Sequence, residues 1–150
     1  MIKNTSLNFE SKEYLEFRDI TDDIEIFIKK TKIKNGNVLI FSTHTTLAIC
    51  INEKEKGIET DFKNLMKRII PKEAYYCHND LSIRTENLVC QSAASDCLNG
   101  HSHCTHLLMR NSETVPIIDG KMVLGIWQKI FAIELDCCRK RKILIQIIGE

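Results

Sequence analysis

The fold class is decided by the stretch VPIIDGKMVL at residues 115–124, which places a tight turn between two short apolar segments. Its central pair, Asp119-Gly120, accepts the positive φ angles that a two-residue β-hairpin turn requires. We therefore expect an antiparallel hairpin at this point of the chain.

Residues 127–135 and 142–148 are the next apolar segments, and we expect them to pair with each other across a turn at 136–141. The cationic run at 139–142 falls in this turn, and we interpret it as solvated. The last third of the chain is thus predicted to be β-structure.

Two helices are expected in the first half. Thr21, followed by two acidic residues, is typical of a helix N-cap, and Asn35-Gly36 is typical of a helix end. The second helix has apolar residues at helical spacing and ends at Pro71. Its apolar positions are Ile58, Phe62, Leu65, Met66 and Ile69.

Further strands are predicted by the alternation at 14–20 and by the β-branched run at 37–52, which indicates two strands or one bent strand. Strands dominate without a regular βαβ rhythm. We therefore expect an α+β fold in a single domain, 1–150, with mostly antiparallel β-sheet layers and two main helices.

Charge and composition exclude several classes of protein. The 150 residues carry 21 Lys and Arg against 20 Asp and Glu, so no basic excess favours nucleic acid or an anionic membrane. No apolar run is long enough to span a bilayer, and the first ten residues are polar. The cysteine count is odd, at seven, and no secretory signal is visible, which indicates free thiols, so we expect a cytoplasmic protein.

The segment NGHSH at 99–103 is the sharpest candidate for a metal site. In an extended chain His101 and His103 would project on the same face, and neutral imidazole suits zinc and related ions. A third ligand must then come from elsewhere, and His44 and His78 are the candidates. Asn99 opens this segment.

Two rival ligand sets remain open. Cys97, His101 and Cys104 would share a helical face, although a glycine at position 100 disfavours an unbroken helix there. His103 and His106 are also spaced to share a helical face.

Two other short segments carry chemistry. Asn52-Glu53 ends an apolar run, and the carboxylate is a candidate general base or a residue that orients a metal ligand. Trp127-Gln128 places a large aromatic ring beside an amide. Such a pair could stack on a flat heterocycle and bind its edge.

Seven short motifs occur together in a familiar order. They are HTT at 44–46, INE at 51–53, YCHN at 76–79, NGHSH at 99–103, VPIIDG at 115–120, GIWQ at 125–128 and IGE at 148–150. With these motifs the chain resembles the YjbQ family, whose members are sometimes called secondary thiamine-phosphate synthase enzymes. The resemblance covers nearly the whole chain.

The resemblance implies an α+β homotrimer that holds a divalent metal such as zinc. It also implies a weak thiamine phosphate synthase activity, which joins hydroxymethylpyrimidine diphosphate to thiazole phosphate and releases pyrophosphate. The expected metal ligands are His44, His78, His101 and His103. The expected catalytic residues are Asn52, Glu53 and Asn99, and the expected substrate-binding residues are Thr45, Trp127 and Gln128.

Three positions depart from the family pattern. Ile126 replaces a usual Thr, Arg110 replaces a usual Gly, and Cys137-Cys138 interrupts a usual Asp-Gly-Pro-Arg turn.

Two alternatives to the synthase function stay open. One is a metal-dependent hydrolase of a small phosphorylated metabolite, and the other is a non-catalytic ligand-binding trimer.

Overall fold

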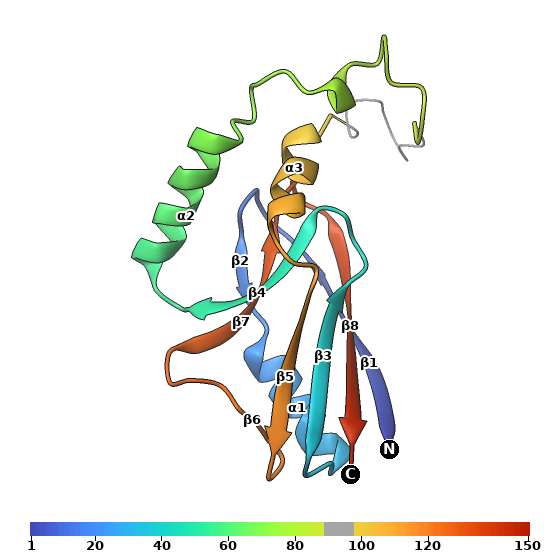
Figure 1. Cartoon of the computed structure of the whole chain (residues 1–150), viewed down its shortest axis with the longest axis vertical. Helices are drawn as coiled ribbons and strands as arrows, with labels where there is room; N and C mark the ends of the chain where they lie inside the picture. Colours follow the sequence, from blue (N-terminus) through green and yellow to red (C-terminus); the bar gives the residue numbers. More distant parts are fainter. Residues whose placement is uncertain (89–97) are drawn as a thin grey trace.

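Two antiparallel sheets form the body of the molecule in the computed structural model, which describes residues 1–88 and 98–150 (Figure 1). The strands are β1 Ile2–Glu10, β2 Phe17–Asp19, β3 Gly36–Ser42, β4 Leu47–Glu53, β5 Ser112–Ile118, β6 Lys121–Met122, β7 Gln128–Glu134 and β8 Lys140–Gly149. The helices are α1 Thr21–Thr31, α2 Lys56–Ile69, α3 Gly100–Leu108 and the short 3₁₀ helix η1 Cys77–Asn79. The α+β class is confirmed, with three α-helices in the described residues.

The five-stranded sheet has the order β1-β8-β3-β5-β6, and the three-stranded sheet has the order β2-β7-β4. The predicted hairpin is confirmed, because β5 pairs with β6 and both Asp119 and Gly120 have positive φ. The predicted pairing of 127–135 with 142–148 is wrong. β7 pairs with β2 and β4, whereas β8 pairs with β1 and β3 in the other sheet.

Both strands are interior strands with a partner on each side, β8 in the five-stranded sheet and β7 in the three-stranded sheet. β8 alternates between buried and exposed residues, whereas five consecutive residues of β7, from Ile130 to Glu134, are buried. Ile130 and Ala132 face the cluster between the sheets, and Phe131 and Ile133 face a second cluster that includes Met66 of α2. β7 is therefore covered on both faces.

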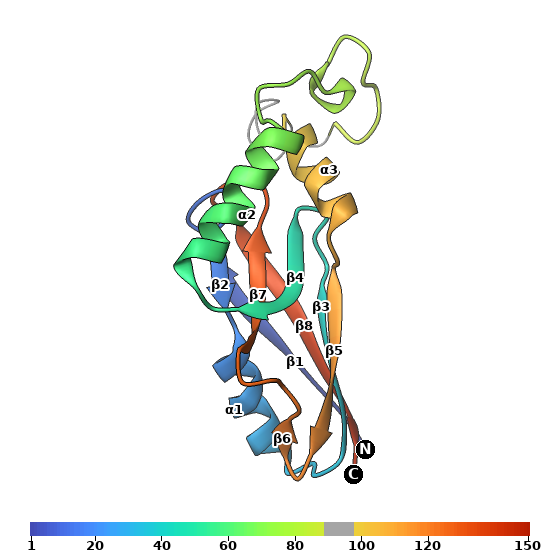
Figure 2. The ribbon, with the colours of Figure 1, turned by 60° about the vertical axis from the view of Figure 1, so that its left-hand side comes forward.

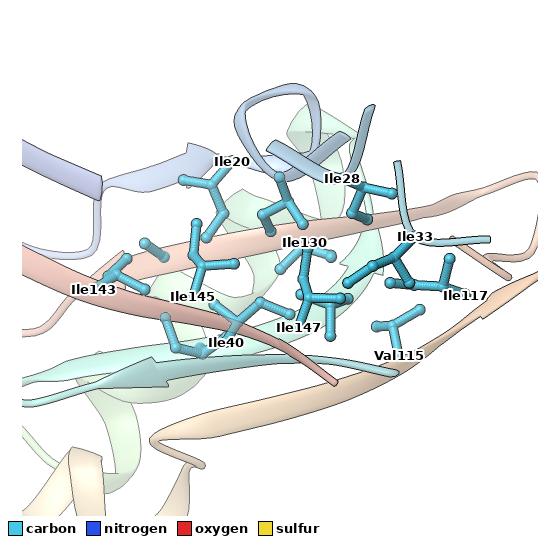
Figure 3. Packing of buried hydrophobic residues seen from close by; sticks show 14 of the residues in the cluster. Ile20, Ile28, Ile33, Ile40, Val115, Ile117, Ile130, Ile143, Ile145 and Ile147 are labelled. Atoms are coloured by element: carbon cyan, nitrogen blue, oxygen red, sulfur yellow. The ribbon is translucent and has the colours of Figure 1, made fainter. Parts of the chain in front are cut away.

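Isoleucine fills the space between the sheets (Figure 3). Ile40, Ile145 and Ile147 come from the large sheet, and Ile130 comes from the small one. Helix α1 contributes Ile24 and Ile28 to the same cluster.

The ends of α1 differ from the prediction. Ile20, not Thr21, is the N-cap, and the Asp19 carboxylate accepts the Thr21 backbone N–H at 3.0 Å. The Thr21 hydroxyl instead accepts the Ile130 N–H at 2.9 Å, which ties the helix to β7. The helix ends at Thr31, and its C-cap Lys32 lies in the left-handed region, before the expected Asn35-Gly36.

Helix α2 runs beside the small sheet (Figure 2). Much of its apolar stripe is exposed. Phe62 and Met66 pack on the second cluster, but Ile58, Leu65 and Ile69 are 41%, 40% and 51% exposed. No helix in the described residues is long and apolar enough to cross a membrane.

Candidate functional site

Helix α3 and η1 meet at the end of the molecule away from α1 (Figure 1). Gly100, the first residue of α3, donates its N–H to the Asn79 side-chain oxygen at 2.8 Å. A Cβ at Gly100 would lie 2.6 Å from the Cβ of Tyr76, so this close approach requires glycine. The helix begins at this glycine and Asn99 is its N-cap, so the expectation that no unbroken helix passes through Asn99-Gly100 is confirmed.

The expected extended conformation of His101 and His103 is wrong. Both lie in α3, where residues two apart point about 200° away from each other. His103 faces His78 of η1, with 4.5 Å between the ring centroids. His101 packs instead against Tyr14, at 5.3 Å in an edge-to-face arrangement, and near Tyr76 at 6.3 Å.

A chain of polar contacts supports His78. Its Nε2 lies 3.1 Å from Asn99 Oδ1, and Asn99 Nδ2 donates to Asp136 Oδ2 at 2.8 Å. Arg139 Nε donates to the same carboxylate oxygen at 2.6 Å. Asn99 and Asp136 are both buried, so this chain is largely shielded from water.

Sequence reasoning did not include Asp136 or Arg139 among the site residues. One signal was present, because they are the first and last residues of the turn that the family resemblance describes as Asp-Gly-Pro-Arg. The prediction that the cationic turn is solvated is wrong for Arg141. That residue is 4% exposed and forms an ion pair with Glu134 of β7.

His44 belongs to a neighbouring network. Arg141 also donates to the Thr46 hydroxyl at 3.0 Å, and His44 Nε2 accepts the Lys142 backbone N–H at 2.9 Å. The lone pair of Nε2 is therefore engaged by the backbone. Thr45, between His44 and Thr46, is exposed.

Burial favours the neutral ring in three of the candidate histidines, because it lowers the pKa of His44, His101 and His103. Desolvation lowers the pKa of His103, and the neighbouring His78 ring lowers it further. Desolvation also lowers the pKa of His101 and of His44. For His44, the nearby Arg141 cation lowers the pKa further. Neutral imidazole is the form that binds a metal ion.

The remaining predicted residues lie at the opposite end of β4 and β7. Asn52 pairs with Lys129 and Glu53 with Gln128, whereas Leu47 pairs with Glu134 near the histidines. Six residue steps along the strands correspond to roughly 20 Å. One chain therefore does not bring Asn52, Glu53 or Gln128 to the histidines.

Local contacts occupy two of these side chains. Asn52 Oδ1 accepts the Glu53 N–H at 2.8 Å, and Gln128 Oε1 accepts the Gly125 N–H at 2.7 Å. The Trp127 ring is not packed in the core, since the residue is 67% exposed.

The residues fit a metal ion in part. His78 and His103 are adjacent imidazoles, but the described residues contain no group of three or more His, Cys, Asp or Glu that could hold an ion. Cys97, which belongs to one rival set, lies outside the described residues, and Cys104 is exposed whereas His101 is buried. His103 and His106 do share α3 at the predicted spacing.

The family model for UPF0047 protein YjbQ-like matches residues 5–150. The chain belongs to the YjbQ family. A UPF0047 protein of Methanothermobacter thermautotrophicus is 34% identical over 144 residues, which cover 96% of this chain and 90% of that protein. The UPF0047 protein YugU of Bacillus subtilis is 30% identical over 149 residues, covering 99% and 100%.

Solved structures of YjbQ-like proteins share the fold. The crystal structure of a YbjQ-like protein of unknown function from Sulfolobus solfataricus aligns with a TM-score of 0.81 at 31% identity, covering all of both chains. A YjbQ/UPF0047 protein from Clostridium acetobutylicum also aligns with a TM-score of 0.81, at 27% identity, covering 96% of this chain and 99% of that one.

Proposed function

We propose that this YjbQ-family chain is a divalent-metal-dependent enzyme that acts on a small phosphorylated heterocycle, with zinc as the ion. The proposal includes thiamine phosphate synthase activity as the reaction and the cytoplasm as its location. The observation that carries the metal site is the His78–His103 pair, which is supported by the buried Asn99–Asp136 contact. His44 is set apart from this pair, because its Nε2 is engaged by the backbone.

The side chains around the pair suit an anionic substrate. A divalent ion held by His78 and His103 would neutralise negative charge on a phosphate or a pyrophosphate leaving group. Arg84 donates to the His78 carbonyl oxygen at 3.0 Å, so a second positive charge lies beside the ring. Guanidinium groups bind phosphate oxygens well, so Arg84 can contribute to substrate binding.

We further propose a homotrimer in which each site is shared between two copies. We call the region around His78, His101 and His103 the histidine end. The histidine end of one copy would be completed by four residues of the next copy, Asn52, Glu53, Trp127 and Gln128. Two observations support this arrangement. The two groups of residues lie roughly 20 Å apart along β4 and β7 of one chain. Ile126 and Trp127 are 86% and 67% exposed, as expected of an interface.

The first test measures metal content and activity together. The chain is purified without a His tag, its zinc is quantified, and the joining of hydroxymethylpyrimidine diphosphate to thiazole phosphate is assayed. His78→Ala and His103→Ala should each lower both readouts by at least about tenfold. His106→Ala is the matched control on the same helix and should retain both. Unchanged metal content in His78→Ala and His103→Ala would contradict the site.

The second test mixes two inactive variants, Glu53→Gln and His103→Ala, in co-expressed trimers. In a shared site, random mixing restores about one quarter of the sites, because each site needs one intact residue from each of two copies. No recovery in mixed trimers would show that each chain forms its own site.

The same assays separate the alternatives. Release of product without the thiazole substrate would favour a metal-dependent hydrolase, in which metal-bound water is the nucleophile. Ligand binding without turnover would favour a non-catalytic trimer.

A further inference from the structure

We propose that Asp136 is a positioning residue that fixes the proton of His78 on Nε2, acting through Asn99. The inference concerns the free protein, and only its consequence for metal binding rests on the function proposed above. Three contacts carry it, in the order Arg139, Asp136, Asn99 and His78.

The first step fixes the orientation of the Asn99 amide. An ionised carboxylate only accepts hydrogen bonds, so the Asn99 atom that faces Asp136 at 2.8 Å must be the NH₂ group. Arg139 keeps the carboxylate in place, and the Asp136 backbone N–H donates to Glu134 Oε1 at 2.8 Å. Because Asp136 and Asn99 are 7% and 9% exposed, water competes little for these bonds.

The second step fixes the tautomer of His78. With its NH₂ group on Asp136, Asn99 presents a carbonyl oxygen to His78 Nε2 at 3.1 Å. A carbonyl oxygen only accepts, so Nε2 must carry the hydrogen. In the neutral ring, Nδ1 then keeps the lone pair and is the atom available to a metal ion.

One contact opposes this assignment. Arg84 Nη1 lies 3.2 Å from the same Nε2 and, as a permanent donor, would favour a bare nitrogen. Arg84 Nη1 also donates to the His78 carbonyl oxygen, at 3.0 Å, so it has an acceptor without the ring. Asn99 has no equivalent choice, because Asp136 sets which end of its amide faces the ring. The Nε2–H tautomer is therefore favoured.

The test is the ¹⁵N chemical shifts of the two His78 ring nitrogens in metal-free protein, at a pH where the ring is neutral. The signals are assigned by their loss in His78→Gln. The wild type should show Nε2–H. In Asp136→Ala the Asn99 amide loses its orientation, and the Nδ1–H form should grow. Asp136→Asn keeps a carbonyl oxygen that can accept from Asn99, so it should retain the wild-type tautomer.

Zinc affinity provides a second readout. It should fall by about 10-fold to 100-fold in Asp136→Ala and by less in Asp136→Asn. If Asp136→Ala does not fold, Asn99→Ala removes the same oxygen acceptor and should also release the tautomer. An Nδ1–H ring in the wild type would overturn the inference, as would an unchanged Nε2–H ring in Asp136→Ala. The expected tautomer without any zinc binding would overturn the proposed metal site instead.

Discussion

Strands β7 and β8 each pass through two regions of opposite character. At one end they contribute Ile130 and Ile145 to the apolar layer between the sheets. At the other end they contribute Glu134 and Arg141, a buried ion pair that joins the two sheets. The same backbone thus supports a region that depends on shape alone and a region in which each charge depends on a named partner.

The difference between the regions is one of directionality. Apolar contacts are non-directional, so many sequences with the right pattern and volume can fill the space between the sheets. A buried charge without its partner is strongly unfavourable, so the histidine end tolerates few changes. The proposed metal site lies at this end. Side chains that stabilise this part of the fold would therefore also support the proposed function.

The largest expected effect comes from Glu134→Ala. It leaves Arg141 buried and unpaired, and the loss in the free energy of unfolding should be about 3–5 kcal/mol. Urea unfolding measures this loss. The double variant Glu134→Leu with Arg141→Met removes both charges and should lose markedly less. An equal or greater loss in the double variant would show that packing, not charge pairing, dominates this region.

The core should respond to volume in graded steps. Ile145→Ala should cost about 2–5 kcal/mol, and Ile145→Val about 0.5–1.5 kcal/mol, because the second change removes a single methylene. Both variants should keep wild-type zinc content once folded, because Ile145 belongs to the apolar layer rather than to the polar contacts of the site. A loss of zinc in folded Ile145→Val would show that the two regions are coupled.

The histidine end should give the protein an acid-sensitive stability. Burial lowers the pKa of His44, His101 and His103 below the usual 6.5, so the unfolded chain binds more protons than the folded chain below that value. The contribution of these histidines to the free energy of unfolding is therefore fully present above about pH 6.5 and is lost as the pH falls below that value.

His101→Phe tests this sign. It keeps an aromatic ring between Tyr14 and Tyr76 but removes the titrating group. It also removes the buried Nδ1, which has no hydrogen-bond partner among the described residues. The slope of unfolding free energy between pH 7 and pH 5 should become shallower than in the wild type. A slope as steep as that of the wild type would contradict the contribution of His101.

The smallest effect on the fold should come from the exposed stripe of α2. Leu65→Ser and Ile69→Ser should change the unfolding free energy of a monomer by no more than about 0.5 kcal/mol, because both side chains are already partly in water. If the stripe lies in the proposed trimer interface, the same changes should lower the mass measured by light scattering. An unchanged trimer would place the interface elsewhere.

The two regions also differ in how far the sequence predicts them. The hairpin at Asp119-Gly120 and the helix that ends before Pro71 follow from local patterns, and both are confirmed. The sheet partners of β7 and β8 do not follow, because apolarity identifies an interior strand without indicating to which sheet it belongs.

The candidate site shows the same limit. The sequence named His78, His103 and Asn99 as candidates, through the short motif at 99–103 and the family resemblance. It did not identify Asp136, which lies 37 residues from Asn99 along the chain and meets it only in the folded protein. It also placed Glu53 beside the histidines, although the β4–β7 register separates them.

Anomalous X-ray diffraction from crystals grown with zinc is the sharpest test of the proposed metal site at His78 and His103. We expect a zinc peak between the rings of His78 and His103, about 2.0–2.1 Å from one nitrogen of each ring. A peak on His44 or His101 with none between His78 and His103, or no peak on any histidine, would contradict it.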